Sequence, residues 1–343
     1  MTSLHTYPLV TVIIPCRNEA RYIGACLDSI LLSEYPRHRM EIIVADGMST
    51  DGTRAIIEER MMRYPESVRM VNNPKKILAS AWNRGIVEGK GTIIMALNAH
   101  GIFNPDYILT CVRYLETTDA DYVGGVINTR SRASTHVGRA IAFVLSNTFG
   151  VGGSRFRTGV ARPTWTDTAA FGGYKRDVFK KVGFFNEQLT RSQDFEFHIR
   201  MKKFGCKILL IPEMVCDYYI RAERIGYFVR DYFSNGFWVT YPLRYSKHFF
   251  SLRHSIPMGF VVALIVLASV SMVSVIAQWL TLGVLVSYVG VAICASLPVA
   301  FRTRDMRYIV TMPGLFFLLH VSYGLGSLYG FIKSKISLPD KHV

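Results

Sequence analysis

The fold is decided by two stretches of similar pattern, VIIPCRNE at residues 12–19 and EIIVADGMSTDGT at residues 41–53. Each contains a short run of β-branched and other apolar residues and ends in a cluster of polar side chains. An apolar run of this length, bounded by polar residues and by proline or glycine, is typical of a buried strand. The two polar clusters therefore mark the points at which two buried strands end.

Strand-like and helix-like segments alternate over the first 97 residues. We predict strands at residues 9–14, 41–45, 68–72 and 92–97, with helices at residues 19–32, 53–63 and 78–88. This alternation with short connections is typical of an α/β domain whose parallel sheet is covered on both faces. The pattern is less regular farther along, where we predict helices at 137–149, 175–182 and 194–204, a mobile loop at 150–162 and a strand at 207–211.

Two stretches of the C-terminal part, residues 258–301 and 308–332, contain no Asp, Glu, Lys or Arg. The first is long enough for two membrane-spanning helices with a turn near Gln278, and the second is long enough for a third. The alternative is a buried apolar hairpin of a soluble protein, although uncharged runs of this length are uncommon there. Aromatic and basic residues interleave over residues 224–250, which favours helices in the membrane interface over an aromatic core helix.

These patterns divide the 343 residues into four regions. We expect an α/β domain at residues 1–223, amphipathic interface helices at 224–257, a membrane region of about three spans at 258–332 and a tail at 333–343. The net charge of +15 and the basic residues beside the apolar runs suit the cytoplasmic leaflet of a membrane. A nucleic-acid partner is not expected, because no basic and aromatic motif of that kind is present.

Three clusters of polar residues follow the first, second and fourth predicted strands, at residues 15–19, 46–53 and 98–100. Because ligands bind at the carboxyl ends of such strands, we expect the clusters to line one crevice. Asp46 is suited to accept a hydrogen bond from a ribose hydroxyl or a base N–H, whereas capping of the next helix explains Ser49 or Thr50. The absence of a Walker or GxGxxG loop argues against ATPase and dinucleotide-binding functions.

Four stretches together resemble the inverting glycosyltransferases of family 2, which have the GT-A fold. They are residues 12–19 and 41–53, FGGYKRDVF at residues 171–179 and QDFEFHIR at residues 193–200. The resemblance covers about residues 9–215. The order of the motifs, with HVSYGLG at residues 320–326, is most similar to the ExoA-type succinoglycan glucosyltransferase branch. The resemblance therefore implies a Rossmann-like GT-A domain followed by C-terminal transmembrane helices.

The resemblance also implies roles for individual residues. The residues that would bind the nucleotide sugar are Pro15, Arg17, Glu19, Asp46 and Asn98, and the first four of them would hold its uridine. Those on the acceptor side would be Phe171, Gly172 and Gly173. Asp194 matches the catalytic base, since a carboxylate can take the proton of the acceptor hydroxyl as that hydroxyl attacks the anomeric carbon. A helix N-cap is the structural alternative for Asp194.

The sequence departs from the family at the DxD motif, which binds the divalent metal that bridges the donor diphosphate. Asn98 and His100 stand at this place and would be the metal ligands. Asn98 occupies the position of a usual acidic residue and His100 that of the last Asp, so the pair brings no negative charge. A Mn²⁺ or Mg²⁺ cofactor is nevertheless what the resemblance implies.

The function implied by the resemblance is the inverting transfer of a sugar from a UDP-sugar to a lipid-linked saccharide, by a membrane-bound enzyme of exopolysaccharide biosynthesis. The branch that the sequence resembles implies that this sugar is glucose. The enzyme would be a multi-pass protein of the cell membrane with its catalytic domain in the cytoplasm. One alternative is transfer to polyprenyl phosphate, as in dolichol-phosphate-mannose synthases. Another is a non-catalytic scaffold subunit of a polysaccharide assembly complex, which Asn98 favours but Asp46 and Asp194 oppose.

Overall fold

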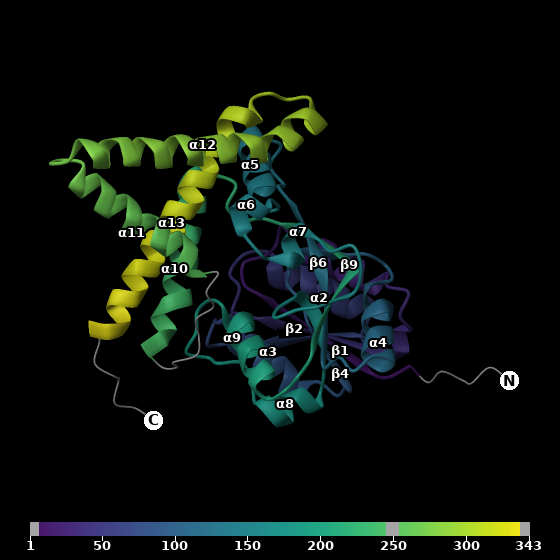
Figure 1. The fold of residues 1–343 in the computed structure, drawn as a ribbon. Coiled ribbons are helices and arrows are strands. Elements are labelled where there is room, and N and C mark those ends of the chain that lie inside the picture. The colour runs from purple at the N-terminus through teal and green to yellow at the C-terminus, as the bar shows by residue number, and fades with distance from the viewer. Residues whose placement is uncertain (1–6, 245–253, 337–343) are drawn as a thin grey trace. The chain divides into compact units, whose positions relative to one another are not determined.

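The computed structural model describes residues 7–244 and 254–336 of the chain. Its contacts divide the chain into two compact units (Figure 1). The first contains Met1–Asn128 and Thr158–Tyr219, and the second contains Thr129–Arg157 and Ile220–Val343. The boundary expected after residue 223 is close to Tyr219, after which the chain enters the second unit for the second time. Residues 129–157 were not expected to belong with the C-terminal helices.

Four parallel strands form one half of the sheet in the first unit. They are β1 (Val10–Cys16), β2 (Met40–Asp46), β3 (Val68–Asn72) and β4 (Ile93–Ala96), in the spatial order β3-β2-β1-β4. The helices between them are α1 (Ile23–Leu31), α2 (Thr53–Arg63) and α3 (Leu78–Glu88). The apolar runs thus predicted this half of the sheet and its helices, with differences only at the ends of elements.

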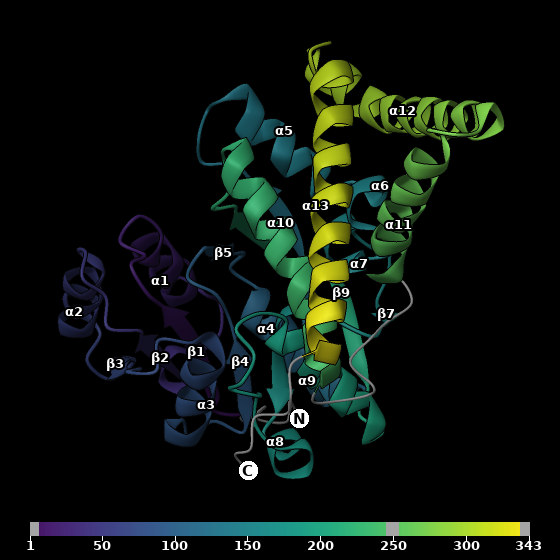
Figure 2. The ribbon, with the colours of Figure 1, turned by 90° about the vertical axis from the view of Figure 1, so that its left-hand side faces the viewer.

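Side chains of the central strands alternate between two layers. Ile14 of β1 belongs to the core that also contains Leu27 of α1 and Ile57 of α2. Ile43 of β2 faces the other way and packs with Ala81 of α3. Figure 2 shows α1 and α2 on one side of these strands and α3 on the other. Burial on both faces explains why the strands are continuous apolar runs in the sequence.

The other half of the sheet is antiparallel, so the expectation of a parallel sheet is confirmed for four strands only. It contains β5 (Gly101–Phe103), β6 (Tyr122–Arg130), β7 (Thr164–Trp165), β8 (Ala170–Lys175) and β9 (Ile208–Tyr219). β8 pairs antiparallel with both β4 and β6, and the order continues through β9 to β5. Antiparallel neighbours need no crossover helix, and the strand-helix alternation accordingly ends at β4.

The remaining helices of the first unit are α4 (Tyr107–Thr117), α8 (Asp177–Val182) and α9 (Gln193–Lys203). The second unit contains α5 (His136–Val144), α6 (Thr148–Val151), α10 (Ile225–Thr240), α11 (Ser255–Val270), α12 (Val275–Thr303) and α13 (Tyr308–Ile336). Part of the loop expected at residues 150–162 is helical, because it contains the short helix α7 (Arg155–Thr158).

Two helices of the described chain, α12 and α13, are long and apolar enough to cross a membrane. The helix α11 has 16 residues, fewer than the roughly 20 that a typical span needs. The turn between α11 and α12 directly precedes Val275, slightly earlier in the chain than the position expected near Gln278, and the Gln278 side-chain amide donates to the carbonyl of Ser271 in this turn at 2.9 Å. The reason is local, since the Ser274 side chain accepts a hydrogen bond from the N–H of Ala277 and caps α12.

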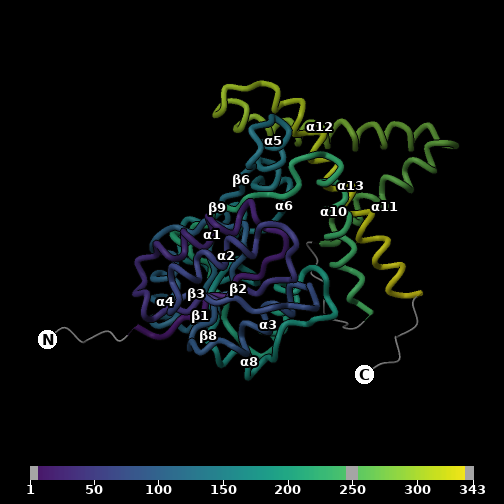
Figure 3. Tube along the Cα trace, turned by 180° about the vertical axis from the view of Figure 1, so that it is seen from behind, coloured from purple at the N-terminus to yellow at the C-terminus, as the bar shows by residue number. Residues whose placement is uncertain are grey.

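The helices α10 and α13 pack against each other at very short distance. A Cβ atom added to Gly236 of α10 would lie 2.0 Å from the carbonyl oxygen of Tyr323, and one added to Gly326 would lie 2.0 Å from that of Phe233. The Thr240 hydroxyl donates to the carbonyl of Ser327 at 2.7 Å. Figure 3 shows the two helices side by side. One face of α10 is therefore a protein contact, while Tyr227 on the same helix is exposed.

Candidate functional site

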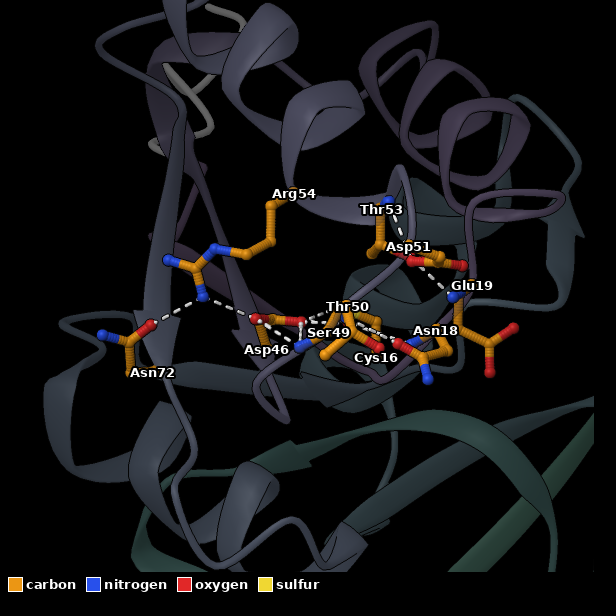
Figure 4. Close-up of polar contacts among 10 residues, drawn as sticks. All are labelled: Cys16, Asn18, Glu19, Asp46, Ser49, Thr50, Asp51, Thr53, Arg54 and Asn72. Carbon is orange, nitrogen blue, oxygen red and sulfur yellow. Dashed lines mark hydrogen bonds and ion pairs between the residues drawn. The ribbon is translucent and has the colours of Figure 1, made fainter.

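The loops that follow β1 and β2 are tied together by reciprocal hydrogen bonds (Figure 4). Asn18 has a left-handed backbone with φ of 54°. Its N–H donates to Oγ of Ser49 at 2.9 Å, and its side-chain oxygen accepts from the N–H of Thr50 at 2.8 Å. The N–H of Glu19 donates to Oγ1 of Thr53 at 2.7 Å. The first two polar clusters predicted from the sequence thus form one fixed edge.

Asp46 ends β2 and is completely buried. Its carboxylate accepts hydrogen bonds from the N–H of Ser49 at 3.1 Å and from the Ser49 hydroxyl. It also forms an ion pair with Nη1 of Arg54, which donates to Oδ2 at 2.7 Å. The same nitrogen donates to the side-chain oxygen of Asn72 at the end of β3, at 3.0 Å. Asp46 is therefore the centre of a network across two strand ends.

Capping of α2 does not explain Ser49 or Thr50, contrary to expectation. The N-cap of α2 is Gly52, and no side-chain cap bond is formed there. Instead, the N–H of Thr53 in the first turn donates to Oδ1 of Asp51 at 3.0 Å. Slight burial is the largest single influence on the pKa of Asp51 and raises it. The hydrogen bonds to its carboxylate together outweigh this effect, so the pKa of Asp51 is lowered.

Pro15 and Arg17, which were also expected to bind the nucleotide, differ in their surroundings. Pro15 is buried inside β1, opposite Ala45 of β2. β4 pairs with β1 only as far as Ile13. The proline lies beyond this residue, so its lack of an N–H removes no hydrogen bond to β4. Arg17 is exposed, and a Cβ atom on Gly47 would lie 3.1 Å from its Cβ atom. Gly47 thus leaves room for the Arg17 side chain beside the ends of β1 and β2.

The third polar cluster joins the first through a buried contact. Nε2 of His100 lies 3.0 Å from Oε1 of Glu19, and both side chains are almost fully buried. Burial lowers the pKa of His100 to about 4, so its imidazole is neutral at pH 7. The ring also lies against Tyr22, with 4.7 Å between centroids. Figure 4 shows the Glu19 carboxylate pointing away from Asp46.

Asn98 shapes the start of this cluster locally. Its side-chain oxygen accepts a hydrogen bond from the N–H of His100 at 3.0 Å, and the side chain is half-buried. This is the arrangement of an Asx turn. The structure thus brings Glu19, Asn98 and His100 together, and it places the Glu19–His100 contact on the inward side of the cluster.

The three residues expected on the acceptor side lie at the start of β8. Phe171 has a left-handed backbone with φ of 45°, and its ring lies 5.6 Å from that of Tyr218. Gly172 and Gly173 are buried in the sheet. A Cβ atom on Gly172 would lie 2.0 Å from the carbonyl oxygen of Val123, so close strand packing requires glycine there. An acceptor role of the three residues stays a prediction.

Asp194 is exposed in the first turn of α9. The helix N-cap is Ser192, whose backbone is left-handed with φ of 61°, so Asp194 is not the cap residue. Oδ1 of Asp194 accepts from the N–H of Phe195 at 2.9 Å. Glu196 is bound on both oxygens by Arg200, with Nη2 at 2.9 Å. Of the two first-turn carboxylates, Asp194 is thus the accessible one.

Comparison with known proteins identifies the family to which this site belongs. A model of glycosyl transferase family 2 matches residues 11–183, which is half of the chain. The chain belongs to glycosyl transferase family 2. It is 33% identical to succinoglycan biosynthesis protein ExoA of Rhizobium meliloti over 66% of this chain and 67% of that protein. The chain is therefore an enzyme that transfers a sugar.

Two further relatives extend over nearly the whole glycosyltransferase chain. One is the dolichyl N-acetyl-alpha-D-glucosaminyl phosphate 3-beta-D-2,3-diacetamido-2,3-dideoxy-beta-D-glucuronosyltransferase of Methanococcus voltae, 28% identical over 94% of this chain and 97% of that protein. The other is the solved mannosyltransferase PcManGT of Pyrobaculum calidifontis, in complex with GDP-Man and Mn²⁺. It superposes with a TM-score of 0.61 at 21% identity over 91% of this chain and 88% of that one, which shows the GT-A fold.

The side chains at the DxD position do not fit a divalent ion as they lie in this glycosyltransferase. A hard cation such as Mg²⁺ prefers several oxygen ligands, of which carboxylates are the strongest. Asn98 contributes one neutral oxygen that accepts from a backbone N–H, and the His100 ring contacts Glu19. Among the residues described by the structure, no group of three His, Cys, Asp or Glu side chains could hold a metal ion.

Two residues of the glycosyltransferase site were not identified from the sequence. One is Arg54, which reaches the ends of β2 and β3 from the first turn of α2. The other is His198, which joins α9 to β8 and to the segment just before β8. Nδ1 of His198 lies 3.0 Å from the Thr168 hydroxyl and Nε2 lies 3.1 Å from the Tyr174 hydroxyl. Burial lowers the pKa of His198 to about 3, so the ring is neutral. His198 thereby anchors the helix that presents Asp194.

Proposed function

We propose that this enzyme transfers a sugar, glucose in the first instance, from a UDP-sugar to a lipid-linked saccharide with inversion at the anomeric carbon. The observation that carries the proposal is the fixed polar edge at the carboxyl ends of β1, β2 and β4 in a family 2 glycosyltransferase. Ligands of open α/β sheets bind at this edge. The exposed carboxylate of Asp194 supplies the second group that the reaction needs.

The donor nucleotide occupies the edge formed by the three polar clusters. Arg17 is the exposed cation of the first cluster, and the network of Asp46 is the rigid part of the second. Pro15 and Glu19 support the edge from within, because both are buried. Asn98 lies at the end of β4, on the third side of this binding region.

Asp194 acts as the general base of the transfer. The acceptor hydroxyl oxygen forms a bond to the anomeric carbon while the bond from that carbon to the diphosphate oxygen breaks. The hydroxyl proton passes to the Asp194 carboxylate, and the electron pair of the broken bond leaves with the nucleoside diphosphate. Attack from the side opposite the leaving group inverts the configuration. Phe171, beside Tyr218, offers an aromatic surface to the acceptor saccharide.

A divalent ion is the group that the family implies for the developing charge on the diphosphate, where it would act as a Lewis acid. Asn98 and His100 do not form such a site in the arrangement seen here. We therefore assign no step of the transfer to a metal. The two side chains remain the place where an ion would first be sought, and the effect of restoring a carboxylate there is predicted below.

The acceptor is proposed to be held at the surface of the cell membrane, with the α/β unit in the cytoplasm. Two apolar helices of sufficient length support a membrane location. The name of the Methanococcus relative contains a sugar joined to a dolichyl phosphate, and that of the Rhizobium relative refers to succinoglycan biosynthesis. The first name supports a lipid-linked saccharide over bare polyprenyl phosphate as the acceptor, and the second supports a role in exopolysaccharide biosynthesis.

A donor and acceptor screen tests the proposal. The release of nucleoside diphosphate is measured for each nucleotide sugar, with a lipid extract or with polyprenyl phosphate as acceptor. We expect UDP-glucose to be the best donor and release to require the lipid-linked saccharide. Release with polyprenyl phosphate alone would support the alternative acceptor, and a preference for another nucleotide sugar would overturn the assignment of UDP-glucose. NMR of the product then establishes whether the anomeric configuration is inverted.

A further inference from the structure

A cavity of about 570 Å³ lies among the helices of the second unit. Figure 2 shows the three helices that line it, α6, α11 and α12, on one side of α13. Their contributions are Phe149 of α6, Phe260 of α11 and, on one face of α12, Leu280, Val284 and Val291. The lining is aliphatic or aromatic apart from Gly283 and Ser287. Its size is that of a small-molecule site, which spans about 300–1,000 Å³.

The polar atoms of the aromatic wall are paired with one another. The Tyr288 hydroxyl lies 2.7 Å from Nδ1 of His320, and Nε2 of the same ring lies 2.9 Å from the carbonyl oxygen of Phe149. A carbonyl only accepts, so Nε2 carries the hydrogen of that bond, and in the neutral ring Nδ1 accepts from Tyr288. The Tyr288 ring stacks on Phe260 with 5.1 Å between centroids. This wall therefore presents carbon surfaces, which suit an apolar ligand.

The part of the wall that α6 contributes is fixed before a ligand arrives. Nδ2 of Asn147 donates to the carbonyl of Ala295 in α12 at 3.1 Å, and the contact with His320 ties α6 to α13. A Cβ atom on Gly150 would lie 2.2 Å from the carbonyl oxygen of Val144, so α6 is also tightly packed. A wall that is already ordered loses little entropy on binding. Residues 129–157, which belong with the C-terminal helices, thus complete a preformed cavity.

The cavity opens sideways along α12. Leu280 is 56% exposed and Val291 is 52% exposed, although both line it. The helix α12 is long and apolar enough to cross a membrane, and residues 258–301 contain no Asp, Glu, Lys or Arg. An apolar chain in the hydrocarbon layer of a bilayer can therefore enter the cavity without passing through water.

We propose that this cavity binds the polyisoprenoid chain of the lipid-linked acceptor. An isoprenoid chain carries a methyl branch in each repeating unit and is wider than a straight acyl chain, and the rings of Phe149, Phe260 and Tyr288 offer it broad apolar surfaces. The inference rests on the proposed function, because it assumes an acceptor that is carried on a lipid. Polyprenyl-linked saccharides and polyprenyl phosphate share this chain, so the site serves either acceptor.

Photolabelling tests the site directly. The full-length protein is placed in phosphatidylcholine nanodiscs with a polyprenyl phosphate that carries a diazirine in its chain, and labelled peptides are identified by mass spectrometry. We expect label on Phe149 and on α12 around Val284, and we expect excess unmodified polyprenyl phosphate to displace it. A phosphatidylcholine with a diazirine in its acyl chain should not label Phe149. Label from the phospholipid that polyprenyl phosphate does not displace would assign the cavity to ordinary bilayer lipid and overturn the proposal.

Two exposed glycines of long apolar helices provide a matched pair of variants. A Cβ atom added to Gly283 of α12 or to Gly314 of α13 meets no described atom within 4 Å, and Gly283 lines the cavity. Because leucine favours a helix over glycine, both variants should fold, which thermal unfolding checks. Gly283→Leu fills part of the cavity and should lower the label on Phe149 by about tenfold, the loss expected when roughly two CH₂ groups lose their contacts. Gly314→Leu should leave the label unchanged.

Kinetics with the same variants extend the test to transfer. The saccharide identified as acceptor is supplied on a long polyprenyl chain or on a farnesyl chain, at concentrations expressed as mole fractions of lipid. We expect Gly283→Leu to raise KM for the long-chain acceptor by about tenfold and to leave kcat and KM for the donor unchanged. The farnesyl acceptor should show a much smaller change. Equal effects on both acceptors, or in Gly283→Leu and Gly314→Leu alike, would overturn the proposal.

The two measurements also separate this inference from the proposed function. If the wild type transfers sugar to a lipid-linked saccharide and Gly283→Leu changes neither the label nor KM, the proposed function stands and the cavity does not hold the chain. If no nucleotide sugar supports transfer but polyprenyl phosphate still displaces the label from Phe149, the proposed function fails and the chain site stands.

Discussion

The polar edge after β1 and β2 and the first turn of α9 are built in opposite ways. At the edge, the side chains of Asn18, Asp46 and Asp51 each accept hydrogen bonds from groups on neighbouring loops or helices. At α9, Asp194 is exposed at the start of a helix that follows a left-handed Ser192. A binding edge gains affinity when its groups are fixed before the ligand arrives, whereas a general base must stay accessible to the proton it removes.

The largest effect is expected on the exposed side of this comparison. Asp194→Asn should lower the rate of sugar transfer by about 10²–10⁴-fold, because an amide cannot accept the acceptor proton. The affinity for UDP should stay near that of the wild type. The rate is measured as release of nucleoside diphosphate at saturating donor and acceptor. Asp177→Asn is the matched control, since Asp177 is also an exposed carboxylate in the first turn of a helix. Comparable rates for the two variants would remove Asp194 from the mechanism.

The next effect concerns the fixed edge. Asp46→Ala should weaken binding of UDP by about 1–3 kcal/mol, because it removes the buried acceptor that holds Arg54 and Ser49. Calorimetry on the full-length protein measures the change. Asp28→Ala serves as the control, since it removes a carboxylate from another Asp–Arg pair, with Arg60. If both variants bind UDP as the wild type does, the edge is not the nucleotide site.

The smallest effect is expected at Asn98, in the polar cluster that follows β4. Asn98→Asp should raise the affinity for Mn²⁺, on the order of tenfold, because a carboxylate replaces a neutral oxygen at nearly the same shape. The Asx turn should persist, since the new carboxylate can still accept the N–H of His100. Binding is followed by electron paramagnetic resonance of Mn²⁺, independently of activity. Asn186→Asp, in the same unit and with a side-chain oxygen that likewise accepts the N–H two residues on, from Gln188 at 2.9 Å, should leave it unchanged, and an equal gain there would indicate a nonspecific charge effect.

The sequence was most informative where structure is local. The runs at residues 10–16 and 40–46 are buried on both faces, and their composition alone indicates this. Of the antiparallel strands, β8 was not predicted and β9 was predicted only in part, because their pairing depends on partners far away in the chain. The strand predicted at 207–211 is the start of β9, which continues to Tyr219 beside β5.

The candidate site was predictable as a set of positions but not as a set of contacts. Asp46 and Glu19 could be selected because Asp46 ends β2 and Glu19 follows β1. Nothing in the sequence indicates that Glu19 turns toward His100 or that Arg54 reaches Asp46, since both contacts depend on how helices pack over the sheet. The membrane region shows the same limit. Composition marked the apolar stretches, but Ser274 determined where α12 begins.

The close packing of α13 has a consequence for the biogenesis of the enzyme. A chain is made from its N-terminus, so α13 leaves the ribosome after every other described helix. Yet α13 is the partner of α10 through Gly326, of α5 through the Thr311–His136 hydrogen bond and of α6 through the His320–Phe149 hydrogen bond. These earlier segments must wait with uncovered faces until α13 has been synthesised. The last of the described helices to be made thus closes the second unit.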